Sequence, residues 1–411
     1  MICRLLSLPL TLVGSVFLLL AQLPYQPLND WIASMLGEGW TEPLFQAYGS
    51  TFQIIAMIAS LGIAYVYAKN EGHEPLSAGI ISVVVFLLTI NSYVVTESGE
   101  TVSGIIPRDA WCGGKGMVSA IIIGLIVGAV YSWFIAKNIT IKMPAGVPQG
   151  VANSFSALIP AAAIITGATI IYTIFRYCFN TTFIEFIYKV IQTPLQGMTD
   201  SLAGVVIYAF LVSLLWWFGV HGATIVSGVM TGILTSNTLE NQAIINAGKE
   251  LTIANGAHVV TQQFIDQFIT VTGSGMTLGL VLCMIFLGKS AQCKQLGRLA
   301  IVPGCFNINE PILFGTPIVM NPFLAVPFIA APVCSAIITY FANSTGLVPP
   351  FSGVTVPWTT PPIISGFLVG GWKASVLQIV DIAVTTEIYF PFFKKIDAMN
   401  LKAEREAQGN E

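Results

Sequence analysis

The sequence predicts an all-α polytopic membrane protein. Of its 411 residues, 55% are hydrophobic and only 9% are charged, whereas soluble domains carry about 25% charged residues. Apolar runs long enough to cross a bilayer, which takes about 20 helical residues, recur along the whole chain. The charges gather in the links between these runs and at the end of the chain. This composition leaves no room for a large soluble domain and predicts a lipid bilayer, not nucleic acid, as the surroundings.

The first half contains five predicted spans. They cover residues 2–23, 46–68, 76–96, 117–136 and 156–178. The bases Arg4, Lys69, Lys137 and Lys142 then fall on one side of the membrane. Since cytoplasmic loops are rich in lysine and arginine, the N-terminus is predicted to lie inside. A signal peptide is the alternative for the first span, but no small-residue cleavage pattern follows it cleanly.

The hydrophobic pattern of the sequence changes after Asn180. Apolar residues recur at helical spacing through 181–200, with Glu185 and Lys189 as an i,i+4 pair on another face. This pattern predicts an amphipathic helix lying at the membrane interface. It divides the chain into a first half (1–180), a second half (201–393) and a tail (394–411).

The second half is predicted to mix spans with a re-entrant segment. The predicted spans cover 203–233, 276–288, 317–342 and 364–393, and the short segment 262–272 is predicted to turn back. The bases of the tail favour the cytoplasm, so both termini are predicted inside, with about ten crossings and one or two hairpins.

The cysteines give no sign of a disulfide framework or a metal site. There are 7, they are scattered, and none forms a C-x-x-C pair. In apolar runs, a free cysteine behaves as a small hydrophobic residue. We therefore expect no metal and no cofactor.

Glu310 is the first candidate functional residue. It is the only acid between Leu299 and Tyr340, where no base occurs, and it stands in Asn307-Ile308-Asn309-Glu310-Pro311. A charge at the bilayer centre costs about 2.5–3.5 kcal/mol on the insertion scale, so such residues are usually functional. The prolines and glycines around it predict a broken helix, which is tolerated where it lines a polar cavity. The sequence thus predicts an intramembrane polar site here.

His221 and Trp216 are predicted to border the same cavity if the helix is irregular between them. His221 lies between Val220 and Gly222 in the string Trp216-Trp217-Phe218-Gly219-Val220-His221-Gly222. A histidine satisfied by a carbonyl in the core is an equally good interpretation of it alone. Glycines beside it permit close approach of a ligand. A carboxylate, an imidazole and indole faces are together typical of sugar binding, so Glu310, Asn309, His221, Trp216 and Trp358 are predicted to form one site.

Other candidates are weaker. Trp358 alone is more simply an interfacial anchor. The loop 108–116 contains Gly113 and Gly114, but it lacks the spacing of a phosphate-binding loop, and an ordinary turn explains it equally well. Its glycines are included as backbone donors to substrate hydroxyls. Asp381, Glu387 and Asp266 do not form the regular series that a proton relay requires.

The motifs resemble those of a known family. Asn309-Glu310-Pro311-Ile312-Leu313-Phe314-Gly315, together with the Trp216–Gly222 string and Pro357-Trp358-Thr359, is similar to the membrane component, enzyme IIC, of phosphoenolpyruvate-dependent sugar phosphotransferase systems. The likeness is to the lactose/cellobiose/diacetylchitobiose group and runs over essentially the whole chain. One departure is the start, where the family normally has a further helical segment.

The resemblance implies a fold, a site and partners. It implies ten spanning helices, two re-entrant hairpins, a homodimer built on the first half, and a location in the bacterial inner membrane. It implies that Glu310 and His221 hold the sugar hydroxyl that receives phosphate, with Asn309, Trp216, Trp358 and, more weakly, Gly113 and Gly114 lining the site. Phosphate would come from a separate enzyme IIB carrying a phosphocysteine, supplied through enzyme IIA and the phosphocarrier protein.

The expected function is therefore translocation of a β-linked disaccharide, cellobiose before chitobiose or lactose. The chain would act as the membrane subunit of a phosphotransferase without a phosphate-carrying residue of its own. An ion-coupled secondary transporter is the alternative, because it also binds its substrate near the midplane. A sensor or channel is a third class, against which the short tail and the lack of a filter motif argue.

Overall fold

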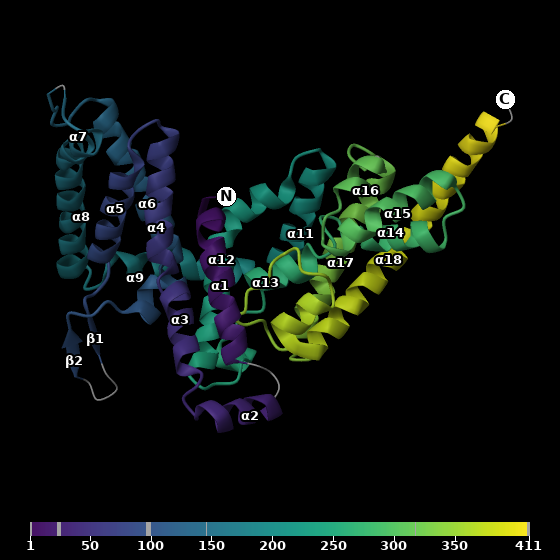
Figure 1. The fold of residues 1–411 in the computed structure, drawn as a ribbon, viewed down its shortest axis with the longest axis horizontal. Helices are drawn as coiled ribbons and strands as arrows, with labels where there is room; N and C mark the ends of the chain where they lie inside the picture. The colour runs from purple at the N-terminus through teal and green to yellow at the C-terminus, as the bar shows by residue number, and fades with distance from the viewer. Residues whose placement is uncertain (1, 23–25, 96–99, 145, 317, 409–411) are drawn as a thin grey trace. The chain divides into compact units, whose positions relative to one another are not determined.

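The computed structural model describes residues 2–22, 26–95, 100–144, 146–316 and 318–408, and these are mostly helical (Figure 1). In this part of the chain the strands β1 (Tyr93–Val95) and β2 (Thr101–Ser103) form an antiparallel hairpin, with Val94 opposite Val102. The contacts divide the chain into two compact units. The first unit holds Met1–Ala21, Pro27–Gly197 and Thr231–Glu240, and the second holds Gln22–Gln26, Met198–Met230 and Asn241–Glu411.

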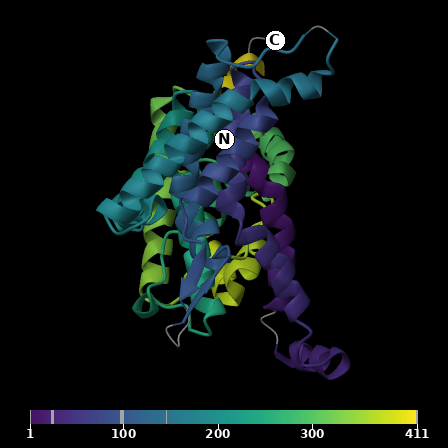
Figure 2. The same cartoon turned by 90° about the vertical axis from the view of Figure 1, so that its left-hand side faces the viewer.

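The first unit is helical, and several of its longer helices run side by side (Figures 1 and 2). Besides the β hairpin its elements are α1 (Ile2–Ala21), α2 (Gln26–Leu36), α3 (Glu42–Phe52), α4 (Ile55–Asn70), α5 (Pro75–Leu88), η1 (Arg108–Cys112), η2 (Gly114–Gly116), α6 (Met117–Ala136), α7 (Gln149–Ser156), α8 (Leu158–Cys178), α9 (Phe183–Ile187), η3 (Tyr188–Gln192) and most of α10 (Thr193–Thr199).

Small residues bring α4 and α6 together. Gly124 and Gly128 form a G-x-x-x-G pair on α6. A Cβ on Gly124 would lie 2.8 Å from Cβ of Ile63, and one on Gly128 would lie 2.7 Å from Cβ of Tyr67. Without a hydrophobic force between helices in lipid, such close packing is what holds them together. The close approach of α4 therefore explains why glycines stand at these two positions of α6.

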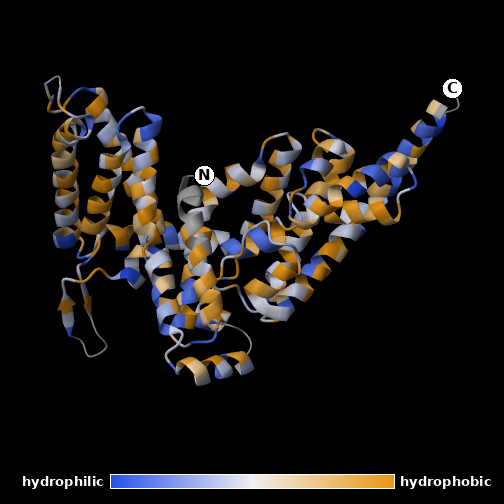
Figure 3. Cartoon of the chain, viewed as in Figure 1, coloured by the Kyte–Doolittle hydropathy of each residue, from blue (hydrophilic) through white to orange (hydrophobic). Residues whose placement is uncertain are grey.

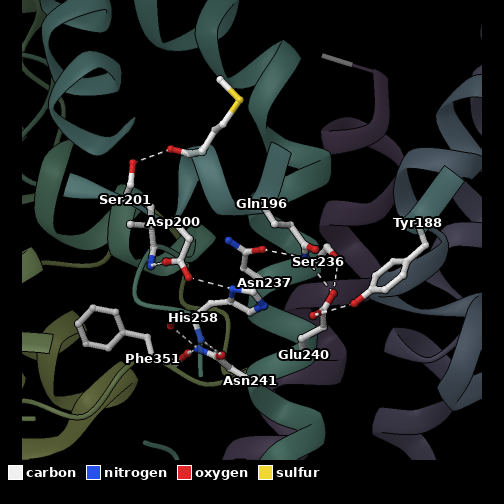
Figure 4. A network of polar contacts seen from close by, with 12 residues as sticks. Tyr188, Gln196, Asp200, Ser201, Ser236, Asn237, Glu240, Asn241, His258 and Phe351 are labelled. Atoms are coloured by element: carbon white, nitrogen blue, oxygen red, sulfur yellow. Dashed lines mark hydrogen bonds and ion pairs between the residues drawn. The ribbon is translucent and has the colours of Figure 1, made fainter. Parts of the chain in front are cut away.

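A polar network ties the segment 183–199 to the middle of α12 (Gly222–Asn246), which also belongs to the first unit (Figure 4). Oε1 of Glu240 accepts hydrogen bonds from Nε2 of Gln196 at 2.8 Å and from Oγ of Ser236 at 2.9 Å. Gln192 donates to Oγ of Ser236 at 2.6 Å. Buried polar groups need such partners, and these residues supply them to one another.

The second unit contains the predicted polar site. Its elements are α11 (Leu202–Trp217), the two ends of α12, η4 (Ile253–Asn255), α13 (Gln262–Phe264), η5 (Ile265–Ile269), α14 (Leu278–Phe286), α15 (Ala291–Cys305), α16 (Glu310–Gly315), α17 (Pro322–Ser344) and α18 (Ile364–Gln408). Helix α18 breaks at Gly370 and Gly371, where Gly371 has φ of 69°. It continues through the residues predicted as a tail.

The prediction of a single span over 203–233 is wrong. Helix α11 ends at Trp217 and α12 begins at Gly222, with Gly219 in the left-handed region at φ of 82° between them. A Cβ on Gly222 would lie 2.1 Å from the carbonyl oxygen of Val212. The apolar composition is continuous across this point, so hydropathy gives no sign of the turn. The two glycines permit the turn because they lack a Cβ atom.

The described helices include five that are long and apolar enough to cross a membrane, or six if the bent pair Phe183–Thr199 and Leu202–Trp217 is one span. Hydrophobic residues predominate along most of the helices, and hydrophilic ones gather in the last turns of α18 (Figure 3). The prediction of a mostly helical membrane protein is confirmed at this level. The count of about ten crossings stays a prediction.

Candidate functional site

The site region is built on a tight loop, residues 270–277, between η5 and α14. Thr272, Gly273, Gly275 and Met276 all have positive φ. Gly273 cannot be replaced without moving Asn309, because a Cβ there would lie 2.3 Å from Cγ of that asparagine. Gly275 similarly leaves space for Phe328, whose ring carbon would lie 2.1 Å from an added Cβ. The glycines of this loop therefore admit side chains from neighbouring segments.

Asn309 fills the space above Gly273. Its Nδ2 donates to the carbonyl oxygen of Ser274 at 2.7 Å and to Oγ1 of Thr277 at 3.0 Å. The side chain is 7% exposed. Asn309 immediately precedes Glu310, which opens α16. The amide thus fixes the start of α16 on the 270–277 loop.

Asn307 joins three segments, although it is not among the site residues predicted from the sequence. Its Oδ1 accepts from the backbone N–H of Thr272 at 2.6 Å, and its Nδ2 donates to the carbonyl oxygens of Trp358 and Thr360. It is buried and has φ of 63°, a conformation that asparagine tolerates better than most residues. Its place beside Glu310 in the motif was the available signal, but its partners lie far away in the sequence.

Buried amides hold the loop 345–363, which carries Trp358. Gln263 accepts from the backbone N–H of Val356 at 2.9 Å, and Gln267 donates to the carbonyl oxygen of Val356 at 3.1 Å. Gln378 accepts from the N–H of Ile363 at 2.6 Å. This loop has little regular structure to satisfy its own backbone, so side chains do so. Trp358 itself is 46% exposed on this supported loop.

A second set of contacts fixes the far end of the same loop (Figure 4). Asn241 donates to the carbonyl oxygens of Phe351 and His258, both at 2.9 Å. Asp200 accepts from Nδ1 of His258 at 2.9 Å and from the backbone N–H of Val260 at 2.7 Å. The ring of Phe351 stacks on that of Phe268, with centroids 4.8 Å apart. The loop is therefore held along most of its length.

Glu310 is not buried among protein atoms, which corrects the expectation of a buried charge. Its side chain is exposed in the chain. Among the described residues its carboxylate has no hydrogen-bond or ion-pair partner. An ionised carboxylate can only accept hydrogen bonds. The oxygens of Glu310 are therefore available to accept hydrogen bonds from hydroxyl groups of a ligand. The apolar sequence around Glu310 therefore carries an accessible carboxylate on a fixed turn.

His221 caps the N-terminus of α12. Its Nδ1 accepts from the backbone N–H of Thr224 at 3.2 Å and lies 2.8 Å from Oγ1 of that residue. Because a backbone N–H can only donate, the neutral imidazole carries its proton on Nε2. The ring is exposed. His221 thus offers an N–H donor on the side away from its own helix.

The rings of Trp216 and His221 lie against each other, and their shared role in a site stays a prediction. Their ring centroids are 4.5 Å apart, with 49° between the ring planes. Nε1 of Trp216 is buried and has no hydrogen-bond partner in the described part of the chain. Such groups are uncommon and call for an explanation, such as a ligand or water.

The turn that carries His221 is anchored next to the segment after α16. Nε1 of Trp217 donates to the carbonyl oxygen of Asn321, and the N–H of Met320 donates to the carbonyl oxygen of Trp217, both at 2.9 Å. The described residues show no hydrogen bond between His221 and Glu310. Their association rests on this shared anchoring of the two segments.

Gly113 and Gly114 lie in the first unit. An added Cβ on Gly114 would lie 2.9 Å from Cβ of Leu239, and its carbonyl accepts from Nε2 of Gln192 at 3.3 Å. Packing therefore explains this glycine, and a role in sugar binding stays a prediction. Beside it, burial raises the pKa of the Cys112 thiol to about 11, although Arg108 opposes the shift.

The second unit thus presents a free carboxylate, an imidazole N–H and exposed or unpaired indoles on anchored turns. The sequence matches the family described as "Phosphotransferase system, EIIC" over residues 5–332. The chain belongs to this family. An EIIC protein is the membrane component of a sugar phosphotransferase system, so the chain takes part in sugar transport, and the family match does not support the ion-coupled alternative.

Relatives extend the match beyond residue 332. The chain is 44% identical to the cellobiose-specific EIIC component of Geobacillus stearothermophilus, over 97% of this chain and 89% of that protein. It is 38% identical to the oligo-beta-mannoside-specific EIIC component of Bacillus subtilis (strain 168), over 98% and 89%. The structure of the transporter ChbC, the IIC component from the N,N'-diacetylchitobiose-specific phosphotransferase system, matches with a TM-score of 0.92 and 40% identity, over 98% and 93%.

Proposed function

We propose that this EIIC protein binds a β-linked disaccharide, cellobiose first, from outside and presents it inside for phosphorylation by enzyme IIB. The choice of cellobiose as the proposed substrate rests on the 44% identity to a cellobiose-specific relative over 97% of the chain. The proposal includes about ten crossings, both termini in the cytoplasm, a bacterial inner-membrane location and a homodimer built on residues 1–180. Enzyme IIA and the phosphocarrier protein take part indirectly.

In this proposal, Glu310 and His221 divide the hydrogen bonds of one sugar hydroxyl. The hydroxyl donates its hydrogen to the free carboxylate of Glu310. The Nε2–H of His221 donates to the same hydroxyl oxygen, because Nδ1 is occupied by Thr224. The bond to the ionised carboxylate contributes about 1.5–3 kcal/mol, and the bond from the neutral imidazole about 0.5–1.5 kcal/mol. Two such bonds fix the hydroxyl in both position and direction.

The same geometry suits phosphoryl transfer. The hydroxyl oxygen attacks the phosphorus of the phosphocysteine on enzyme IIB, the P–S bond breaks, and the thiolate of enzyme IIB leaves. The hydroxyl proton passes to the carboxylate of Glu310, which makes Glu310 the general base. Catalysis here is mostly positioning and electrostatics, and the protein needs no phosphate-carrying residue of its own.

Aromatic and amide groups complete the proposed site. The indoles of Trp216 and Trp358 line the proposed site and cover the apolar faces of the sugar rings. Asn309 contributes mainly by fixing Glu310, since its Nδ2 bonds to Ser274 and Thr277. Asn307 fixes Trp358 relative to Glu310. Backbone groups at Gly113 and Gly114 remain the weakest part of the proposal.

A two-part experiment tests the proposal. Purified protein is titrated with cellobiose, lactose, N,N'-diacetylchitobiose and maltose, the last as the α-linked counterpart of cellobiose. The protein is then reconstituted in vesicles with phosphoenolpyruvate and the soluble phosphotransferase components, and the internal product is identified. We expect tightest binding of cellobiose and accumulation of its phosphate. Uptake of unmodified sugar that collapses with a protonophore would contradict the mechanism, and tighter binding of another disaccharide would correct the substrate.

A further inference from the structure

An apolar groove lies between α17 and α18, away from the motif residues described above. Its volume is about 560 Å³, within the range of about 300–1,000 Å³ typical of ligand pockets. From α17 and the residues after it the groove is lined by Ile337, Phe341 and Leu347, and from α18 by Trp372, Val376 and Val380. Phe341, Leu347 and Trp372 are 52%, 69% and 67% exposed. The groove is therefore open along one side.

One cation stands at an end of this groove. Lys373 lines it next to Trp372, and along α18 these are the first lining residues while Val380 is the last. Lys373 is the only base between Arg298 and Lys394 in the sequence. Its side chain is exposed and has no hydrogen-bond or ion-pair partner among the described residues. The wall from Trp372 to Val380 is about 12 Å long at 1.5 Å per residue.

The position of Lys373 along α18 fits a membrane interface. Helix α18 is long and apolar enough to cross a bilayer. The distance along the helix from Lys373 to Lys394 is about 30 Å, which equals the usual thickness of the hydrocarbon core. Exposed tryptophan beside lysine is typical of the level of the lipid headgroups. Lys373 then lies at the headgroups and the apolar wall extends towards the bilayer centre.

We propose that this groove binds an anionic phospholipid. The phosphate of the headgroup pairs with the ammonium group of Lys373, and one acyl chain lies along Phe341, Val376 and Val380. Charge complementarity favours an anionic lipid over a second copy of the chain, because the groove offers a cation and no acid to balance it. Lipid is also the surroundings of an exposed apolar surface on a membrane-spanning helix. The proposal does not depend on the identity of the sugar.

Native mass spectrometry on protein from vesicles of phosphatidylglycerol mixed with phosphatidylcholine tests the proposal. Lys373→Gln should reduce the preference for phosphatidylglycerol roughly five-fold, the effect of one lysine near an anionic surface. Lys402→Gln, in the charged last turns of α18, should leave it unchanged. Val376→Phe should fill the groove and lower occupancy by both lipids, whereas Ile379→Phe, on the same helix but outside the groove lining, should not.

Three outcomes would overturn the proposal. An unchanged preference in Lys373→Gln would remove the anionic headgroup from the site. Unchanged occupancy in Val376→Phe would place the bound lipid elsewhere. Loss of a dimer in Val376→Phe, without any bound lipid in the original protein, would make the groove an interface between copies. Sugar binding by each variant serves as the folding control, because the groove residues are not part of the proposed sugar site.

Discussion

Two carboxylates on helical segments differ in what surrounds them. In the first unit, Glu240 accepts hydrogen bonds from Gln196 and Ser236, and Tyr188 approaches its other oxygen at 3.5 Å. In the second unit, Glu310 has no such partner within the described residues. Polar groups that the protein itself satisfies hold helices together, whereas a free group on a fixed turn remains available to a ligand. Glu240 thus stabilises the first unit, whereas Glu310 is left free for the ligand-binding role proposed for it.

The largest expected effect is at Glu310. Glu310→Gln removes the proposed general base and should lower the rate of sugar phosphorylation at least about 100-fold, within the range of general-base catalysis. Thermal stability should change little, since Glu310 has no hydrogen bond or ion pair to lose among the described residues. The rate is measured with phosphorylated enzyme IIB, and sugar binding is measured separately without a phosphate donor.

Glu240→Gln is the matched comparison. It weakens the bonds with Ser236 and Gln196 and should lower the free energy of unfolding by about 1–3 kcal/mol, with sugar affinity close to that of the original protein. A thermal shift assay and sugar titration give the two values. If Glu240→Gln abolished phosphorylation while Glu310→Gln did not, the distinction between the two carboxylates would be wrong.

Asn307→Ala is expected to have the next largest effect. It leaves the N–H of Thr272 and the carbonyls of Trp358 and Thr360 without their partner, at about 1–3 kcal/mol per buried group. Sugar affinity should fall because the loop with Trp358 is no longer fixed relative to Glu310. The dissociation constant and the melting temperature are measured together.

Asn343→Ala provides the control for that variant. Asn343 is also buried and donates to a carbonyl of the same loop, that of Pro349, at 3.4 Å. It should lower stability but leave sugar affinity nearly unchanged. Equal losses of affinity in the two variants would mean that Asn307 has no special role in positioning Trp358.

His221→Asn is expected to have a smaller effect. Asparagine is a good N-cap and retains an acceptor for Thr224, but it cannot place a donor where Nε2 lies. Stability should be retained while sugar affinity falls roughly ten-fold, the equivalent of about 1.4 kcal/mol. His221→Ala should also lose about 1 kcal/mol of stability from the missing cap. Unchanged sugar affinity in His221→Asn would exclude donation from Nε2.

The smallest effect is expected for a buried group of the first unit. Because the pKa of Cys112 is raised to about 11 by burial, its thiol stays protonated at neutral pH, and only the thiolate is a good nucleophile. N-ethylmaleimide at pH 7.5 should leave Cys112 unmodified and label the exposed Cys178. The raised pKa favours the folded state at lower pH, so stability from this group declines as the pH rises towards 11. Rapid labelling of Cys112 in the folded protein, followed by peptide mass spectrometry, would contradict its burial.

The amino-acid sequence alone determined the fold class and the main candidate residues. Low charge and long apolar runs restrict a chain to membrane-spanning helices, because unsatisfied backbone is too costly in lipid. A lone acid within such a run, as at Glu310, stands out for the same reason. The sequence motifs around Glu310 and His221 were also sufficient to indicate the EIIC family to which the chain belongs.

The tertiary structure decided how these residues are held and which of them are free. Hydropathy did not reveal the turn at 218–221, because the residues on both sides of it are equally apolar. Nor did the sequence indicate that Asn307 bonds to Thr272, Trp358 and Thr360, since hydrogen bonds between distant segments leave no periodic pattern. Local composition reflects the solvent around a chain, whereas the partners of a buried polar group depend on which distant segments pack beside it.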